Sequence, residues 1–259
     1  MSLQKMNAPF SESDTNRPLL NIYTTAGYPH KESTGELLVT VSDAGVDFIE
    51  LGMPYSDPLA DGDTIQASSS TALRNGITLK RIFEQVAEVR AKVKPPIILM
   101  GYYNQVLRYG QQAFLDDCVK SGVDGLILPD LPLDIYEAEF QADLEKRDLG
   151  ISFLVTPRTP DDRIRKIDSL CRGFLYVVSS SSTTGSKAGG IDQQQAYFER
   201  LTKLELKAPR LIGFNIKDAE SLHATTRHAA GGIIGSAFIR ALDASDVSGS
   251  ATRFVEGLR

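Results

Sequence analysis

The chain has 259 residues, 42% of them hydrophobic, which is enough to bury a substantial core as one large α/β barrel or as two modest domains. Its formal net charge is -5, and its 28 lysine and arginine residues are scattered along the sequence. This distribution lacks the basic run with which proteins bind nucleic acid or anionic membranes, so we expect neither partner.

Two further features of the composition concern the compartment. The N-terminus has no apolar signal core, and no apolar run approaches the roughly 18 residues that a membrane span needs. The two cysteines, Cys118 and Cys171, lie in helical patterns without a CxxC spacing, which favours buried thiols over metal ligands or a disulfide. We therefore expect a cytoplasmic protein.

The first residues of the chain show no regular pattern. Residues 1–17 are polar and aperiodic, and a second methionine, Met6, follows closely on Met1. We predict that residues 1–17 are disordered or derived from an expression vector. Residues 18–259 are then expected to form a single folded domain, because no interior low-complexity stretch marks a linker.

From residue 19 onward, short apolar runs alternate with amphipathic stretches. The predicted strands are Leu19–Thr24, Val46–Leu51, Pro96–Gly101, Gly125–Leu128, Ile151–Val155, Phe174–Val178, Leu211–Phe214 and Gly232–Ile234. The predicted helices are Ser33–Ala44, Leu79–Lys92, Gln111–Ser121, Asp134–Arg147, Asp161–Leu170, Gln193–Lys203, Asp218–Ala230 and a last one that ends near Leu258.

Eight strand and helix units in about 250 residues predict an α/β fold of the (β/α)8 TIM-barrel class. The alternative is an open, doubly wound sheet, which usually carries a glycine-rich dinucleotide turn after its first strand. Here the residues 24–29 read TTAGYP, so we favour the barrel.

Two carboxylates mark the exit of the second predicted strand. Glu50 lies at the carboxyl end of that strand, and Asp61 lies in the loop beyond it, in the run ELGMPYSDPLADGDTIQ of residues 50–66. Burying a charged residue is costly unless it is paired or used, and parallel barrels carry their chemistry at the carboxyl ends of the strands. Glu50 is therefore a candidate catalytic residue, or else an ordinary ion-pair partner.

Three later loops suit the binding of an anion. The loop 179–192 is rich in serine and glycine and longer than the usual βα connection, which predicts either a mobile lid or a surface loop without a role. Gly213-Phe214-Asn215 and Gly235-Ser236 follow the seventh and eighth predicted strands, where barrels often bind phosphate. The three histidines, His30, His223 and His228, show no spacing typical of a metal site.

These residues carry a resemblance to a known family. The run 50–66, the segment Met100–Asn104, the residues Pro129-Asp130-Leu131-Pro132, and Tyr176 resemble the tryptophan synthase α subunit family, and the likeness extends over Leu19–Leu258. The resemblance implies a barrel enzyme that cleaves indole-3-glycerol phosphate by retro-aldol chemistry into indole and glyceraldehyde 3-phosphate. It also implies that indole passes to a pyridoxal-phosphate β subunit in an α2β2 heterotetramer, and that the chain itself needs no metal or organic cofactor.

The resemblance further assigns roles to individual residues. The catalytic residues would be Glu50, Asp61 and Tyr176. The phosphate would be bound by Thr184, Gly185, Gly213, Asn215, Gly235 and Ser236. The indole pocket would be lined by Tyr23, Ile65, Leu128, Leu154 and Phe214, each of which could equally be simple core. The β subunit would dock through Asp57, Pro58, Asn104 and Pro132.

The expected chemistry distinguishes the two carboxylates. A carboxyl against an apolar ring should have a raised pKa, so Glu50 would exchange protons, whereas Asp61 would stay ionised and accept the indole N–H. The sequence departs from the family at Asn215, where glycine is frequent, and at residues 180–183, which lack an arginine that Lys187 could replace. Two alternatives remain: a stand-alone lyase that releases indole, and a non-catalytic phosphate-binding subunit that activates a partner.

Overall fold

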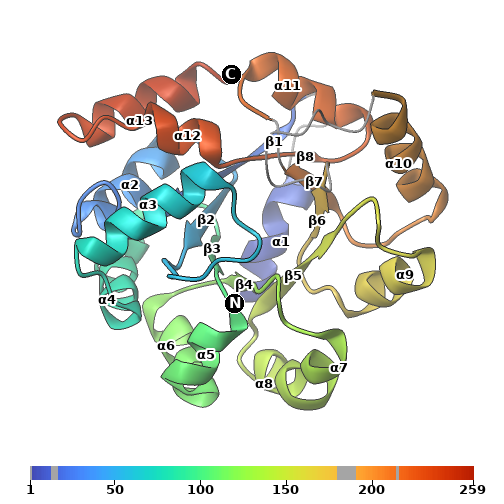
Figure 1. The fold of residues 1–259 in the computed structure, drawn as a ribbon, viewed down its shortest axis with the longest axis horizontal. Coiled ribbons are helices and arrows are strands. Elements are labelled where there is room, and N and C mark those ends of the chain that lie inside the picture. Colours follow the sequence, from blue (N-terminus) through green and yellow to red (C-terminus); the bar gives the residue numbers. More distant parts are fainter. Residues whose placement is uncertain (1, 13–16, 180–190, 214–215) are drawn as a thin grey trace.

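The computed structural model describes residues 2–12, 17–179, 191–213 and 216–259. Eight parallel strands close into one barrel in chain order, with the last strand paired to the first (Figure 1). The strands are β1 Leu19–Thr25, β2 Phe48–Gly52, β3 Ile97–Met100, β4 Gly125–Ile127, β5 Gly150–Val155, β6 Leu175–Val178, β7 Arg210–Gly213 and β8 Gly231–Ile234. The predicted (β/α)8 barrel is confirmed.

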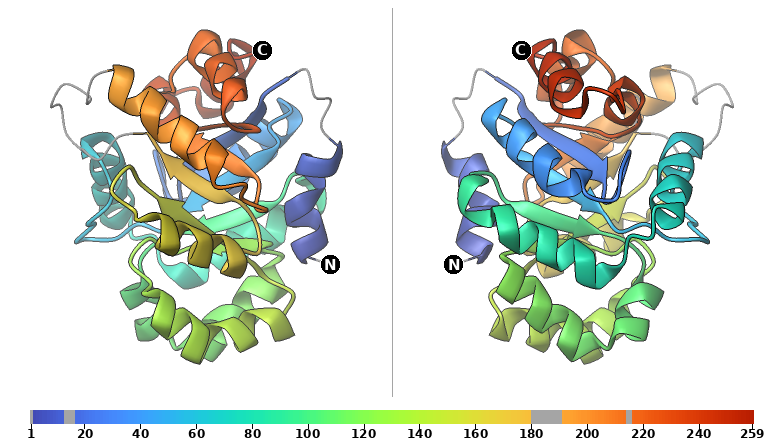
Figure 2. Two further views of the ribbon diagram at one scale, coloured as in Figure 1. Left: turned by 90° about the vertical axis from the view of Figure 1, so that its right-hand side faces the viewer. Right: turned by 90° about the vertical axis from the view of Figure 1, so that its left-hand side faces the viewer.

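Helices surround the barrel and follow its strands (Figures 1 and 2). They are α2 Ser33–Asp43, α3 Asp63–Arg74, α4 Leu79–Val89, α5 Tyr103–Tyr109, α6 Gln111–Ser121, α7 Leu133–Ile135, α8 Gln141–Lys146, α9 Asp161–Leu170, α10 Ile191–Lys203, α11 Ala219–Ala224, α12 Ser236–Ala241 and α13 Val247–Glu256. Short 3-10 turns occupy Arg90–Lys92 and Thr225–Arg227, and a π turn at Tyr136–Phe140 joins α7 to α8.

Local sequence explains where these helices begin and end. The hydroxyl of Thr78 accepts a hydrogen bond from the Arg81 backbone N–H and so caps the start of α4, whose Ile82 and Val86 are buried one turn apart. Gly122 ends α6 with φ of +83°, a backbone conformation that favours glycine. The expected helix 134–147 is interrupted by the π turn, whose extra residue the helical period does not reveal.

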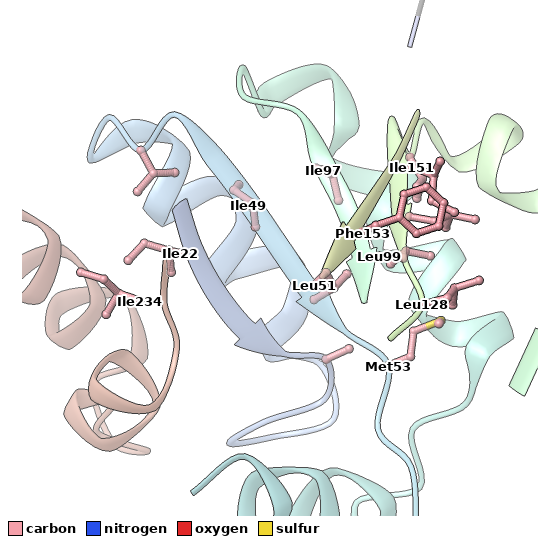
Figure 3. Close-up of a cluster of buried hydrophobic side chains, with 14 of the residues drawn as sticks. Ile22, Ile49, Leu51, Met53, Ile97, Leu99, Leu128, Ile151, Phe153 and Ile234 are labelled. Atoms are coloured by element: carbon pink, nitrogen blue, oxygen red, sulfur yellow. The ribbon is translucent and has the colours of Figure 1, made fainter. Parts of the chain in front are cut away.

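Alternation along the strands divides the core into two layers. One set of side chains lies between the strands and the helices, where Figure 3 shows Ile22, Ile49 and Leu99. The other set fills the inside of the barrel. Successive strand residues point to opposite faces of the sheet. A polar strand residue that alternates with the first set must therefore lie inside the barrel. The inner set includes Leu19, Phe48, Ile98, Ile127, Phe174, Tyr176, Leu211 and Ile233.

The N-terminal segment is ordered, contrary to expectation. Residues Ser2–Glu12 form helix α1, which lies across the amino-terminal end of the barrel, where Met6 is fully buried. The ring of Phe10 lies 5.0 Å from that of Phe48 and 6.2 Å from that of Phe174. The prediction of disorder was wrong for these residues, because so few apolar side chains anchor α1 that no period is visible in the sequence.

Candidate active site

Glu50 lies inside the barrel, close to its carboxyl end. It is the third residue of β2 and pairs in register with Tyr23 of β1 and Ile98 of β3. Its side chain is fully buried, and its Oε1 accepts a 2.6 Å hydrogen bond from Nδ2 of Asn21. Its Oε2 has no hydrogen-bond partner among the described residues. This is the environment in which a carboxyl group keeps its proton.

Burial changes the acidity of Glu50 as the sequence predicts. Desolvation raises its pKa from 4.5 to about 8, and the hydrogen bond from Asn21 opposes this rise by stabilising the charged form. Among the described residues, no cation contributes to the pKa of this carboxyl group. Glu50 is therefore poised to give and take a proton near neutral pH.

Asp61 belongs to the loop that follows β2. The hydroxyl of Tyr102 donates a 3.0 Å hydrogen bond to its Oδ2 and accepts a 2.9 Å bond from the backbone N–H of Ala60. Burial raises the pKa of Asp61, and the bond from Tyr102 counteracts the rise. The ionised state of Asp61 therefore stays a prediction.

A small open cavity lies at this end of the barrel. It holds about 230 Å³ of empty space, including its mouth, and Glu50 is not among the residues that line it. The lining residues are Tyr23, Met53, Asp61, Met100, Gly101, Tyr102 and Pro129. Asp61 thus faces the cavity, and Glu50 pairs in register with Tyr23, which is one of the lining residues.

The predicted catalytic groups lie close enough for the charges of the carboxylates to affect the tyrosines. Burial raises the pKa of the Tyr176 hydroxyl, and the charges of Glu50 and Asp61 raise it further. The same two carboxylates raise the pKa of Tyr23, after burial as the main cause. The structure therefore brings together Glu50, Asp61 and Tyr176 from β2, the following loop and β6.

Two glycines allow the tyrosines to occupy the barrel mouth. A methyl group on Gly52 would overlap the hydroxyl of Tyr23, and one on Gly213 would overlap the ring of Tyr176. Each glycine therefore leaves the space that the aromatic ring of a neighbouring strand fills.

The predicted phosphate residues are only partly described. Gly213 ends β7, and Gly235 and Ser236 begin α12 directly after β8, so these three residues lie at the carboxyl end of the barrel. Gly235 lies against Tyr23, since a Cβ placed there would be 3.3 Å from the Cβ of that tyrosine. Three other predicted phosphate residues, Thr184, Gly185 and Asn215, lie outside the described part of the chain. So does Phe214 of the predicted indole pocket. The same holds for most of the predicted lid.

The predicted indole pocket needs one correction. Ile65 is buried with Tyr23 and Ile239, and Leu154 packs inside the barrel. Leu128, in contrast, belongs to the layer between the barrel and the helices (Figure 3). A shift of one residue along a strand reverses the face, and it is Ile127 that points inward.

Sequence reasoning missed two residues that hold the carboxylates. Asn21 was not singled out, although a polar residue within the apolar run of the first strand is an informative exception. Tyr102 lies within the segment Met100–Asn104 that resembles the family, but the sequence assigns it no role. Both bonds join residues far apart in the sequence, so no local spacing could reveal them.

The predicted docking residues lie at the same end of the barrel, with Asn104 in α5 and the other three in loops. Asp57, Asn104 and Pro132 are exposed, and Pro58 is half-buried. Nδ2 of Asn104 donates a 2.9 Å hydrogen bond to the hydroxyl of Tyr55, which links α5 to the loop that carries Asp61.

Within the described residues, no cluster of three or more His, Cys, Asp or Glu side chains is placed to hold a metal ion. No described helix combines the length and the apolar character needed to cross a membrane. The thiols of Cys118 and Cys171 are free.

Comparisons with known proteins show the family of the chain. The family model described as tryptophan synthase alpha chain matches residues 10–256. The tryptophan synthase alpha chain of Christiangramia forsetii is 48% identical over 98% of this chain and 100% of its own length, and that of Flavobacterium johnsoniae is 48% identical over the same shares.

Solved structures give the same result. An aminoacrylate-bound tryptophan synthase from M. tuberculosis superposes with a TM-score of 0.86 at 28% identity, over 98% of this chain and 97% of that one. A chain of the tryptophan synthase a2b2 complex from Pyrococcus furiosus superposes with a TM-score of 0.84 at 35% identity, over 92% and 96%. The chain belongs to the tryptophan synthase alpha chain family.

Proposed function

We propose that Glu50 and Asp61 carry out the cleavage of indole-3-glycerol phosphate into indole and glyceraldehyde 3-phosphate, the lyase reaction of this family in tryptophan biosynthesis. One observation carries the proposal: a fully buried carboxyl group with a pKa of about 8 lies beside the cavity that Asp61 lines. A proton donor and an acceptor for the ring N–H are what this reaction needs.

The reaction begins with protonated Glu50. It gives its proton to indole C3, which places a positive charge on the ring nitrogen, and the carboxylate of Asp61 stabilises that charge by accepting the N–H hydrogen bond. The Glu50 carboxylate then takes the proton from the hydroxyl on the carbon bonded to C3. The C3–C bond breaks, its electrons return to the ring as indole, and the carbon leaves as the aldehyde.

Proton balance follows from this sequence. Glu50 loses one proton and regains one, so it ends in its starting state, and the indole ring serves as the electron sink. The charges of both carboxylates raise the pKa of the Tyr176 phenol, which supports a position of this phenol beside the reacting carbon atoms. Residues Thr184, Gly185, Gly213, Asn215, Gly235 and Ser236 would bind the phosphate.

Release of indole from indole-3-glycerol phosphate tests this function. We expect weak release by the chain alone and a clear increase when the cognate β subunit is added. A high rate without a partner that the β subunit does not increase would instead indicate a stand-alone lyase. If the chain stimulates the reaction of the β subunit but cleaves no indole-3-glycerol phosphate itself, it is a non-catalytic activator.

We further propose that the β subunit docks on the loops at the carboxyl end of the barrel. A large apolar side chain supports this surface: Leu59 is 82% exposed in the loop between Pro58 and Asp61. Large exposed apolar side chains are frequent at protein interfaces. The free thiols of Cys118 and Cys171 suit a reducing compartment, so we place the complex in the cytoplasm.

The variant Leu59→Lys tests the docking surface. We expect it to weaken the complex by about tenfold or more, because a buried apolar contact is replaced by a charge that must be desolvated. Size-exclusion chromatography with the β subunit and the stimulated rate of indole release measure the effect. Val119→Lys is the matched control, since Val119 is 45% exposed near the end of α6, away from these loops. Equal binding by both variants would rule out this surface.

A further inference from the structure

Asn21 is a buried polar residue whose bonding is incomplete. Its side chain is fully buried inside the barrel, two residues before Tyr23 on β1. Nδ2 donates the 2.6 Å hydrogen bond to Oε1 of Glu50, while Oδ1 has no partner among the described residues. A buried amide with an unbonded oxygen lowers the stability of the fold, and proteins keep such groups mostly at functional sites.

The hydrogen bond from Asn21 makes the two oxygens of the Glu50 carboxyl group inequivalent. Oε1 accepts from Asn21, and a hydrogen bond to this oxygen favours the lone pair over an added proton. Oε2 is buried without a partner in the described part of the chain. The proton of the acid therefore belongs on Oε2, and the negative charge left after its transfer is stabilised at Oε1.

We propose that Asn21 is a positioning residue for the lyase reaction: it fixes the Glu50 carboxyl group so that Oε2 gives and takes the proton, and it stabilises the carboxylate that forms midway. This inference rests on the proposed role of Glu50. Asn21 acts through Glu50, because it pairs in register with Phe48, two residues before Glu50 on β2, and so lies deeper in the barrel.

Other titratable groups face Glu50 from neighbouring elements. The charge of Glu50 raises the pKa of Tyr23 on β1 and of Tyr176 on β6. The charge of Asp61, in the loop after β2, does the same. Burial raises the pKa of both phenols, so neither ionises near neutral pH. The change of charge at this site near pH 8 therefore belongs to Glu50.

The variant Asn21→Leu tests the proposal, because leucine has a similar size but no donor. We expect kcat for indole release to fall about 10-fold to 100-fold with KM nearly unchanged, since a hydrogen bond to a charged group is lost. The pKa of Glu50, followed through its carbonyl stretch by infrared difference spectroscopy against Glu50→Gln, should rise. The melting temperature should change little, because the unbonded Oδ1 disappears while Oε1 of Glu50 loses its donor.

A purely structural residue would behave differently. Ser152 is the matched control: it is buried in β5, and its Oγ accepts a 3.0 Å bond from the backbone N–H of Phe174. Ser152→Ala should lower the melting temperature and leave kcat and the Glu50 pKa unchanged. If Asn21→Leu shows that same pattern, with wild-type kcat and pKa, the proposal is wrong.

Two further variants keep the test decisive. Asn21→Asp retains the shape and places a second acid against Oε1, so the Glu50 pKa should rise even if Asn21→Leu fails to fold, and an unchanged pKa would overturn the proposal. In a Glu50→Gln background, Asn21→Leu should have no additional effect on kcat. A fully active Glu50→Gln would refute the proposed function itself, whereas an impaired Glu50→Gln with an unimpaired Asn21→Leu refutes only the role of Asn21.

Discussion

Glu50→Gln is expected to reduce indole release from indole-3-glycerol phosphate by about 10²-fold or more, the scale of general acid–base catalysis. Glutamine has nearly the same shape and keeps an oxygen for the bond from Asn21, but it has no acidic proton to give to indole C3. The rate is measured with the β subunit at saturating concentration, so that a docking defect does not imitate a catalytic one.

The pH dependence of the wild-type rate provides a second measurement. Glu50 must begin the cycle protonated, and its pKa is about 8. Turnover should therefore be maintained below this pH and fall as the pH rises through it. Glu84→Gln is the matched control, since Glu84 is exposed on α4. Wild-type turnover in Glu50→Gln, or a rate that does not fall on the alkaline side, would contradict the proton-donor role.

The same pKa has a consequence for stability whose sign can be worked out. Between its ordinary pKa of 4.5 and its folded value of about 8, Glu50 holds a proton in the folded chain but not in the unfolded one. The folded state then binds more protons, so stability decreases as the pH rises through this window. Glu50→Gln lacks this loss. Its free energy of unfolding should therefore increase relative to that of the wild type from about pH 5 to about pH 8. Loss of activity without loss of stability separates catalysis from folding.

The barrel itself was predictable because its signal is local. Each strand is a short apolar run and each following helix has its own period, so eight units appear without knowledge of any long-range contact. Glu50 and Asp61 were predicted for a related reason: Glu50 is a charged residue near the end of an apolar strand, and Asp61 lies in the loop that follows, where barrels place their chemistry.

The face of the sheet to which a strand residue points was less predictable. β4 comprises only Gly125–Ile127, which is too short for alternation to show which side chains point inward. Leu128 and Ile127 are both apolar, so only the register with β3 and β5 decides that Ile127 lies inside the barrel. The partners of the carboxylates were hidden in the same way, since Asn21 and Glu50 are 29 residues apart.

Helix α1 leads to the other prediction with a large effect. Met6→Ala should lower the free energy of unfolding by about 2–5 kcal/mol, because Met6 is fully buried and its removal leaves a cavity at the base of the barrel. Chemical denaturation measures this loss. Asn7→Ala is the matched control on the same helix, since Asn7 is exposed, and it should change stability by less than about 0.5 kcal/mol. Equal stability of the two variants would mean that α1 does not dock.

Glycines in the strands show why Met6 fits this place. A methyl group on Gly125 would come 2.5 Å from the sulfur of Met6, whereas the nearest atom outside Met6 is the carbonyl oxygen of Gly150 at 3.3 Å. Gly125→Ala should therefore destabilise the wild type strongly but the Met6→Ala variant much less, and the difference measures the contact directly. Additive effects would show that Met6 lies elsewhere.

Activity should respond differently from stability at this end of the barrel. Met6 packs at the amino-terminal ends of the strands, whereas Glu50 and the cavity lie toward their carboxyl ends. Well below its melting temperature, Met6→Ala should therefore keep the wild-type kcat for indole release. A kcat that falls together with stability would mean that α1 also controls the geometry of the Glu50 site, since the inner residues that Phe10 contacts, Phe48 and Phe174, lie two residues before Glu50 and Tyr176.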